Sequence, residues 1–166
     1  MRIFIACVSF FTVALISLWV LFFNVLYPLK YKEEILAAAN AYKIEPALIA
    51  AVINAESSFD KSKISPKNAI GLMQLLPSTA SSLTEGEIDL FNPKVNINLG
   101  AKYLSYLIKK FGDVDTALFA YNAGEGNVAR WLAAENKTKL TSCPFKETNA
   151  YVAKIKRTIP YYRNRI

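Results

Sequence analysis

Apolar residues follow two patterns along the chain: one long run at the N-terminus, and a helical repeat after it. No charged residue occurs from Ile3 to Leu29. A helix needs about 20 apolar residues to cross the hydrocarbon core of a bilayer, so this run is long enough to span one. We therefore expect two parts, a transmembrane anchor over residues 1–29 and a folded domain over residues 30–166.

A cleaved signal peptide is the alternative interpretation of the N-terminal run. Arg2 supplies a minimal positive charge ahead of it. The run ends at Tyr27 and Pro28, however, and no small-x-small cleavage site follows it, which favours an uncleaved anchor. Charge alone does not fix the orientation, because Lys30 and Lys32 come directly after the run.

The rest of the chain is predicted to be helical, giving an all-α domain of roughly eight short helices. Pro46 suits a first helical turn, and the apolar residues that follow it recur at helical spacing. Asn92-Pro93 is a typical helix start, and Gly112 a typical stop. Pro160 is expected to end or bend the last helix. The predicted helices cover residues 33–42, 47–56, 77–83, 92–111, 114–122, 128–134 and 147–162. A minor β-hairpin near residues 69–72 is the one alternative to an all-helical domain.

Composition narrows the possible chemistry. The chain has no histidine, which excludes Ser-His-Asp and Cys-His catalysis and every metal site that uses histidine. Its two cysteines, Cys7 and Cys143, lie in the apolar run and in a loop, so no internal disulfide is expected. The net charge of +7 is not concentrated in the dense Lys/Arg clusters of a nucleic-acid groove, so we expect no nucleic-acid partner. The side chains that remain available for catalysis are carboxylates, hydroxyls, amides and lysines. We expect no cofactor and no metal.

Glu56 is the first candidate for chemistry. It follows Val52 by four residues and Ile53 by three, so the three side chains share one face of a helix. A carboxyl group on an inward face is partly desolvated, which raises its pKa and allows it to donate a proton near neutral pH. A solvent-exposed glutamate at the end of a helix is the more common arrangement when the position is considered alone.

Four ordered motifs favour a catalytic Glu56 over a solvent-exposed one. They are Glu56-Ser57-Ser58-Phe59, Gly71-Leu72-Met73-Gln74, Ala120-Tyr121-Asn122-Ala123-Gly124, and Glu147-Thr148 with Tyr151-Val152. In this order and spacing the chain resembles the soluble lytic transglycosylase family over about residues 31–162. The resemblance implies a lysozyme-like fold and a peptidoglycan substrate.

The resemblance also implies roles for individual residues. Glu56 corresponds to the family's sole catalytic carboxylate, which protonates the glycosidic oxygen and then helps to close a 1,6-anhydro ring on the muramic acid residue. Ser57 is expected to hold that carboxylate or contact substrate, and the hydroxyl of Tyr121 to lie close to Glu56. The expected substrate-binding residues are Ser57, Met73, Gln74, Tyr121, Asn122, Glu147 and Tyr151. Because the substrate is cell-wall glycan, the domain is expected on the extracytoplasmic side of the membrane.

Two other hypotheses about the function stay open at this point. A hydrolytic muramidase on the same fold needs a second acidic residue to activate water, and Asp60 and Asp113 are the candidates. A non-catalytic wall-binding module needs no acid at all, and the presence of Glu56 argues against it.

Overall fold

The protein is described by a computed structural model that covers residues 2–166, with side chains described for residues 12–19 and 21–166. Over this range the chain forms eight α-helices and, in place of strands, only isolated antiparallel bridges that join Ile70 to Ile64 and to Leu75. The helices are α1 (Arg2–Leu26), α2 (Lys32–Tyr42), α3 (Pro46–Ser57), α4 (Pro77–Leu83), α5 (Pro93–Phe111), α6 (Val114–Ala123), α7 (Glu125–Ala134) and α8 (Lys146–Arg163). The all-α prediction is therefore confirmed, and the alternative hairpin amounts to two bridges.

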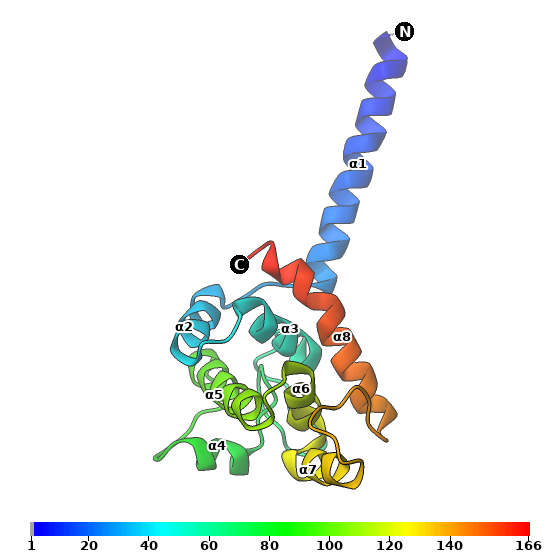
Figure 1. The fold of residues 1–166 in the computed structure, drawn as a ribbon. Coiled ribbons are helices and arrows are strands. Elements are labelled where there is room, and N and C mark those ends of the chain that lie inside the picture. The colour runs from blue at the N-terminus through cyan, green and yellow to red at the C-terminus, as the bar shows by residue number, and fades with distance from the viewer. Residues whose placement is uncertain (1) are drawn as a thin grey trace.

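The N-terminal helix stands apart from the other seven. In Figure 1, α1 projects away from a globule formed by α2 to α8. Among the described residues, no helix combines the length and the apolar character needed to cross a membrane. Residue 1 and the side chains of residues 2–11 and 20, on which the predicted anchor also rests, lie outside the described part of the chain.

Helix α3 forms the centre of the globule. Nine of its twelve residues are buried, and its sequence is almost entirely small or branched apolar residues between Pro46 and Ala55. Helices α8 and α2 pack against it, while α5 packs against α2 and α6 (Figure 1). Since α3 is covered on several sides, residues 47–54 are all buried, and the last turn, which carries Glu56, reaches the surface of the globule.

Most predicted helix boundaries agree with the structure to within one residue, and the start of α7 differs. Helix α7 begins at Glu125, three residues earlier than predicted, because Gly124 at φ 89° both ends α6 and caps α7. Helix α8 continues through Pro160 to Arg163, which agrees with the predicted range 147–162, so of the two expected effects of this proline the ending of the helix does not occur. The last turn is held by packing, since Tyr162 is fully buried there.

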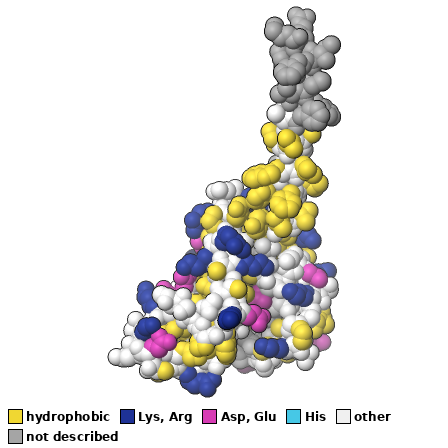
Figure 2. All heavy atoms as spheres, turned by 90° about the vertical axis from the view of Figure 1, so that its right-hand side faces the viewer, with side chains coloured by type: hydrophobic (Ala, Val, Ile, Leu, Met, Phe, Trp, Pro, Cys, Tyr) yellow, Lys and Arg dark blue, Asp and Glu magenta, His cyan; other side chains and the backbone are white. Residues whose placement is uncertain are grey.

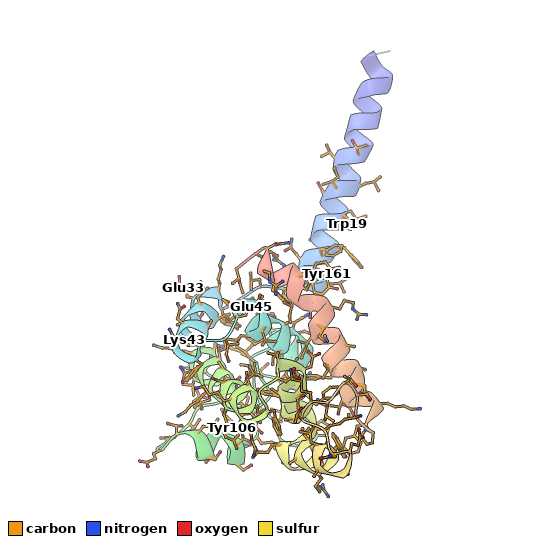
Figure 3. All side chains as sticks on the ribbon, viewed as in Figure 1. Trp19, Glu33, Lys43, Glu45, Tyr106 and Tyr161 are labelled. Carbon is orange, nitrogen blue, oxygen red and sulfur yellow. The ribbon has the colours of Figure 1, made fainter. Side chains whose placement is uncertain are left out.

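The C-terminal turn of α8 fixes the end of α1. The rings of Tyr27 and Tyr161 stack with centroids 4.5 Å apart and planes 9° apart, and Figure 3 shows Tyr161 beside the lower end of α1. Arg165 donates a hydrogen bond to the Tyr27 carbonyl at 2.6 Å, and the Tyr162 hydroxyl donates to the Pro28 carbonyl at 3.1 Å. The first helix is thus joined to the globule through contacts and not only through the connecting residues.

One buried amide organises the irregular segments between α3 and α5. Asn96 on α5 donates to the carbonyls of Ile70 and Leu90, each at 2.9 Å, and accepts from the amide of Met73 at 2.7 Å. Gly71 must be glycine here, because its φ is 78° and an added Cβ would lie 2.4 Å from the Asn96 amide nitrogen. Asn96 therefore fixes the loop that faces Glu56.

Replacing Asn96 with alanine should destabilise the fold strongly. The change leaves the Leu90 carbonyl and the Met73 amide without their partner, and the Ile70 carbonyl keeps only its bond from the Leu75 amide. Each unsatisfied buried group costs about 1–3 kcal/mol. We expect a loss of about 3 kcal/mol or more, which lowers the melting temperature of a chain of this size by about 10 °C. Asn98→Ala, which removes only an exposed bond from Tyr42, is the control and should change it little. Equal melting temperatures for the two variants would contradict the role given to Asn96.

Candidate active site

Glu56 lies in the last turn of α3, where the chain reverses sharply. Ser58 and Phe59 both have positive φ angles, 53° and 64°, and the side chain of Phe59 is buried beneath the turn. This geometry ends the helix and directs the following loop, residues 60–74, back past Glu56. The carboxyl group is therefore placed between α3, this loop and α8.

Tyr151 is the direct partner of the Glu56 carboxyl group. It is buried on α8 and donates a hydrogen bond from its hydroxyl to Oε1 of Glu56 at 2.8 Å, across 95 residues of sequence. Burial raises the pKa of Glu56 from 4.5 to about 7, against the opposing effects of the Tyr151 hydroxyl and of Lys63 and Lys154. Burial also raises the pKa of Tyr151 well above its usual value, so Tyr151 stays protonated and remains a donor. A carboxyl group of this kind can give up and take back a proton near neutral pH.

Two adjoining cavities open beside Glu56. One has a volume of about 480 Å³ and lies toward Lys63, Tyr151 and Lys154; the other, of about 390 Å³, lies toward Leu76 and Tyr121. Both are lined by Glu56, Ser65, Pro66, Gln74, Asn122 and Glu147. Their shared residues make them parts of one groove with the carboxyl group between them, a shape that suits a chain-like ligand passing through.

Three of the predicted substrate-binding residues line this groove on both sides of Glu56. The amide nitrogen of Gln74 donates to the carbonyls of Gly71 at 2.9 Å and Lys63 at 3.0 Å, which orients its side chain against the loop. The amide oxygen of Asn122 accepts from the Thr148 hydroxyl at 2.7 Å, which leaves its NH2 group for a ligand. Glu147 is exposed and lines both cavities. The structure brings these residues together from the loop, from α6 and from α8.

Three other predicted residues make contacts within the protein that the sequence did not indicate. Tyr121 lines the groove, and the charge of Glu56 acts on its hydroxyl, which agrees with the expected proximity. That hydroxyl donates to the Met73 carbonyl at 2.8 Å, however, and the hydrogen bond to Glu56 comes from Tyr151. The hydroxyl of Ser57 is buried and lies 2.8 Å from the Leu72 carbonyl, so it holds the loop and neither the carboxylate nor a ligand.

The side chain of Met73 is also directed inward. It is fully buried, and it fills the space beside Gly100 on α5, where an added Cβ would lie 2.4 Å from its sulfur. Only the main chain of Met73 serves the groove, through the carbonyl that meets Tyr121. The expectation that its side chain lines the cleft does not agree with this position.

Two lysines of the groove were not singled out from the sequence. The ammonium of Lys63 donates to the main-chain carbonyl of Glu56, and that of Lys154 lies 3.5 Å from the carbonyl of Ala55. A partial signal existed for Lys154, because it follows Tyr151 by three residues and so shares its helix face. Lys63 sits in an irregular loop, where no periodicity indicates its direction.

Comparison with known proteins assigns the chain to a family. The family model described as the transglycosylase SLT domain matches residues 33–142. The chain is 32% identical over 152 residues to a soluble lytic murein transglycosylase of Salmonella typhimurium, covering 83% of this chain and 24% of the relative. It is 37% identical over 118 residues to the membrane-bound lytic murein transglycosylase C of Histophilus somni, covering 61% of this chain and 32% of the relative.

A solved structure gives the same result for the fold. The crystal structure of the 70 kDa soluble lytic transglycosylase from Escherichia coli matches with a TM-score of 0.76 and 32% identity, over 83% of this chain and 25% of that one. The expected lysozyme-like, all-α fold is thereby confirmed. The chain spans about a quarter of the length of the soluble relatives that it matches. Together with the family match, these likenesses show that the chain belongs to the transglycosylase SLT domain family.

Proposed function

We propose that this chain is a peptidoglycan lytic transglycosylase that cleaves the β-1,4 bond between N-acetylmuramic acid and N-acetylglucosamine. The observation that carries the proposal is the partly buried Glu56, which lies midway along an open groove and accepts a hydrogen bond from the buried Tyr151. Membership of the transglycosylase SLT domain family supports the same substrate, since its relatives are named as lytic murein transglycosylases.

In the first step Glu56 acts as a general acid. With a pKa of about 7, about half of the carboxyl groups carry a proton at neutral pH and most of them do in a mildly acidic compartment. The proton passes to the bridging oxygen, and the bond from that oxygen to C1 of the muramic acid residue breaks. The N-acetyl carbonyl of the same residue stabilises the positive charge that develops at C1, as in substrate-assisted glycosidases.

In the second step Glu56, now a carboxylate, acts as a general base. It takes the proton from the C6 hydroxyl of the muramic acid residue, and the C6 oxygen bonds to C1. The products are a 1,6-anhydro end and a free 4-hydroxyl on the other sugar, and Glu56 is protonated again. The Tyr151 hydroxyl stabilises the intermediate carboxylate, while Gln74, Asn122 and Glu147 are placed to bind the sugars on either side.

A hydrolytic reaction on the same fold has less support. Asp60 is exposed, and its carboxylate accepts bonds from the amide and hydroxyl of Ser62. Asp113 caps α6 through Thr116. Neither lines the groove, so the two candidates for activating water are engaged elsewhere. Of the described carboxylates, Glu147 alone shares the groove with Glu56.

We also propose that residues 1–29 anchor the chain in a membrane and that residues 30–166 act on the extracytoplasmic side. The long uncharged run and the likeness to a membrane-bound relative support the anchor, and a cell-wall substrate supports the extracytoplasmic side. Figure 2 shows hydrophobic side chains around the described part of α1 nearest the domain. The stacking of Tyr27 on Tyr161 would then hold the groove at a set distance from the bilayer.

Glu56→Gln should abolish cleavage while leaving the fold intact. Glutamine keeps the shape and can accept the bond from Tyr151, but it has no proton to donate. The measurement is mass spectrometry of the fragments released from purified sacculi by the full-length protein in detergent. Wild type should release 1,6-anhydro ends, each lighter by one water than a hydrolytic product, and the variant none. Reducing ends from wild type would instead identify a muramidase, and no product from a folded wild type would favour a binding module.

Tyr151→Phe should shift the pH profile of cleavage toward higher pH. Wild-type activity is expected to fall as pH rises above about 7, because Glu56 loses its proton there. The Tyr151 hydroxyl stabilises the charged form, so its removal raises the pKa of Glu56 and moves this decline to higher pH, while the maximal rate falls about 10- to 100-fold. Tyr162→Phe, which removes a buried hydroxyl bound to Pro28, should leave the position of the decline unchanged. An unshifted profile in Tyr151→Phe would argue against the direct bond.

The membrane anchor can be tested by extraction. When the full chain is expressed in bacteria, we expect it to remain in the membrane fraction after washing with alkaline carbonate and to be released by detergent. Replacing Leu18 and Leu21 with lysine places charges in the run, each of which costs about 2.5–3.5 kcal/mol near the bilayer centre. The double variant should move to the soluble fraction. Release of the wild-type chain by carbonate alone would contradict the anchor.

A further inference from the structure

Two lysine ammonium groups share a cavity with Glu56, and their charges lower its pKa without forming a close ion pair. Lys63, from the loop, and Lys154, from α8, both line the larger cavity. Within the described residues neither forms an ion pair, although five other Lys or Arg residues do, namely Lys110, Lys137, Lys139, Lys156 and Arg163. Two unpaired cations on one cavity wall make it favourable for an anion.

The two lysines are held close to one another despite their like charges. Both reach the C-terminal carbonyls of α3, at Glu56 and Ala55, where cations interact favourably with the helix end. Burial lowers the pKa of Lys154, and the charge of Lys63 lowers it further. Each ammonium carries three N–H donors and uses one of them here. The remaining donors are therefore set beside the cavity on side chains that are already ordered.

The protein itself offers little to neutralise this pair. Glu56 must be uncharged for the first step of the proposed reaction, and Glu147 lines the same cavity without forming an ion pair with either lysine. Asp60 feels the charge of Lys63, but its oxygens already bind Ser62. The missing negative charge is thus expected from a ligand in the cavity.

The chemistry of the substrate supplies such a charge at one place. The sugar rings of the glycan are neutral, and its ionised groups lie on the peptide stem, which the muramic acid residue carries through its lactyl ether. We propose that Lys63 and Lys154 form a subsite for a carboxylate of the peptide stem on the muramic acid residue that Glu56 attacks. This inference rests on the proposed function, and it makes the enzyme selective for glycan that still carries its peptides.

Binding tests the subsite without requiring catalysis. Calorimetry on the full-length Glu56→Gln protein in detergent would compare a soluble muropeptide with free stem carboxylates and the same saccharide without its peptide. We expect the muropeptide to bind at least about tenfold more tightly, as loss of a charge-assisted bond predicts. Adding Lys63→Gln and Lys154→Gln should remove this difference. The control adds Lys94→Gln and Lys109→Gln, which make the same change in net charge outside the cavity and should preserve it.

Kinetic measurements then separate recognition of the peptide stem from an effect of the lysines on the pKa of Glu56. Both lysines lower the pKa of Glu56, so their loss could alter the rate through the acid alone. Cleavage is therefore measured at about pH 5.5, below that pKa of about 7, where Glu56 is protonated in every variant. Wild type should favour peptide-bearing over peptide-free glycan, chiefly through KM, and Lys63→Gln/Lys154→Gln should cleave both alike.

The possible results are distinct. A preference that persists in the double lysine variant, or no preference in wild type, overturns the subsite. A peptide-dependent difference in binding that disappears with the lysines, but without anhydro products from wild type, supports the subsite and overturns the proposed reaction. The absence of both binding and cleavage by the folded protein overturns both.

Discussion

The site depends on one buried contact, the hydrogen bond from the Tyr151 hydroxyl to Glu56. Burial between α3 and α8 makes the charged carboxylate unfavourable, while the hydroxyl stabilises it. The pKa of about 7 is the result of these opposing effects, and burial is the larger. Since one residue must both donate and accept the proton in the proposed reaction, a value near neutrality serves both steps. The packing of α8 on α3 is therefore a requirement of the proposed chemistry as well as of the fold.

The opposite wall of the groove depends on a second polar contact, far from the carboxyl group. Asn96 fixes the main chain at Ile70, Leu90 and Met73, and Met73 in turn accepts from Tyr121. Gln74 follows directly in the chain with a φ of 49° and completes the wall. These bonds are buried or partly buried, and they hold the loop in place without regular secondary structure. Rigid walls reduce the ordering that a ligand must otherwise impose on binding.

The environment of Glu56 also bears on the choice between transglycosylation and hydrolysis. Asp60 and Asp113 are engaged in local capping bonds, and Glu147 is exposed at the edge of the groove. A single desolvated acid beside two lysines favours a reaction in which the substrate supplies its own nucleophile. The same lysines connect catalysis to recognition. A carboxylate bound between them would weaken their effect on Glu56 and raise its pKa, so that a larger fraction of Glu56 carries the proton it must donate.

The sequence by itself determined the helices and the order of the motifs, and it singled out Glu56 as the candidate acid. Helical periodicity and local caps such as Asn92 and Asp113 act between near neighbours, so they can be read from a short window. The sequence did not determine which tyrosine donates to Glu56, or that the Met73 side chain points into the core. Nor did it bring Lys63 and Lys154 together, since they are far apart in the chain and meet only where the loop and α8 both reach the end of α3. These features were decided by the tertiary structure, because hydrogen bonds and packing between distant segments leave no periodic trace in the order of residues.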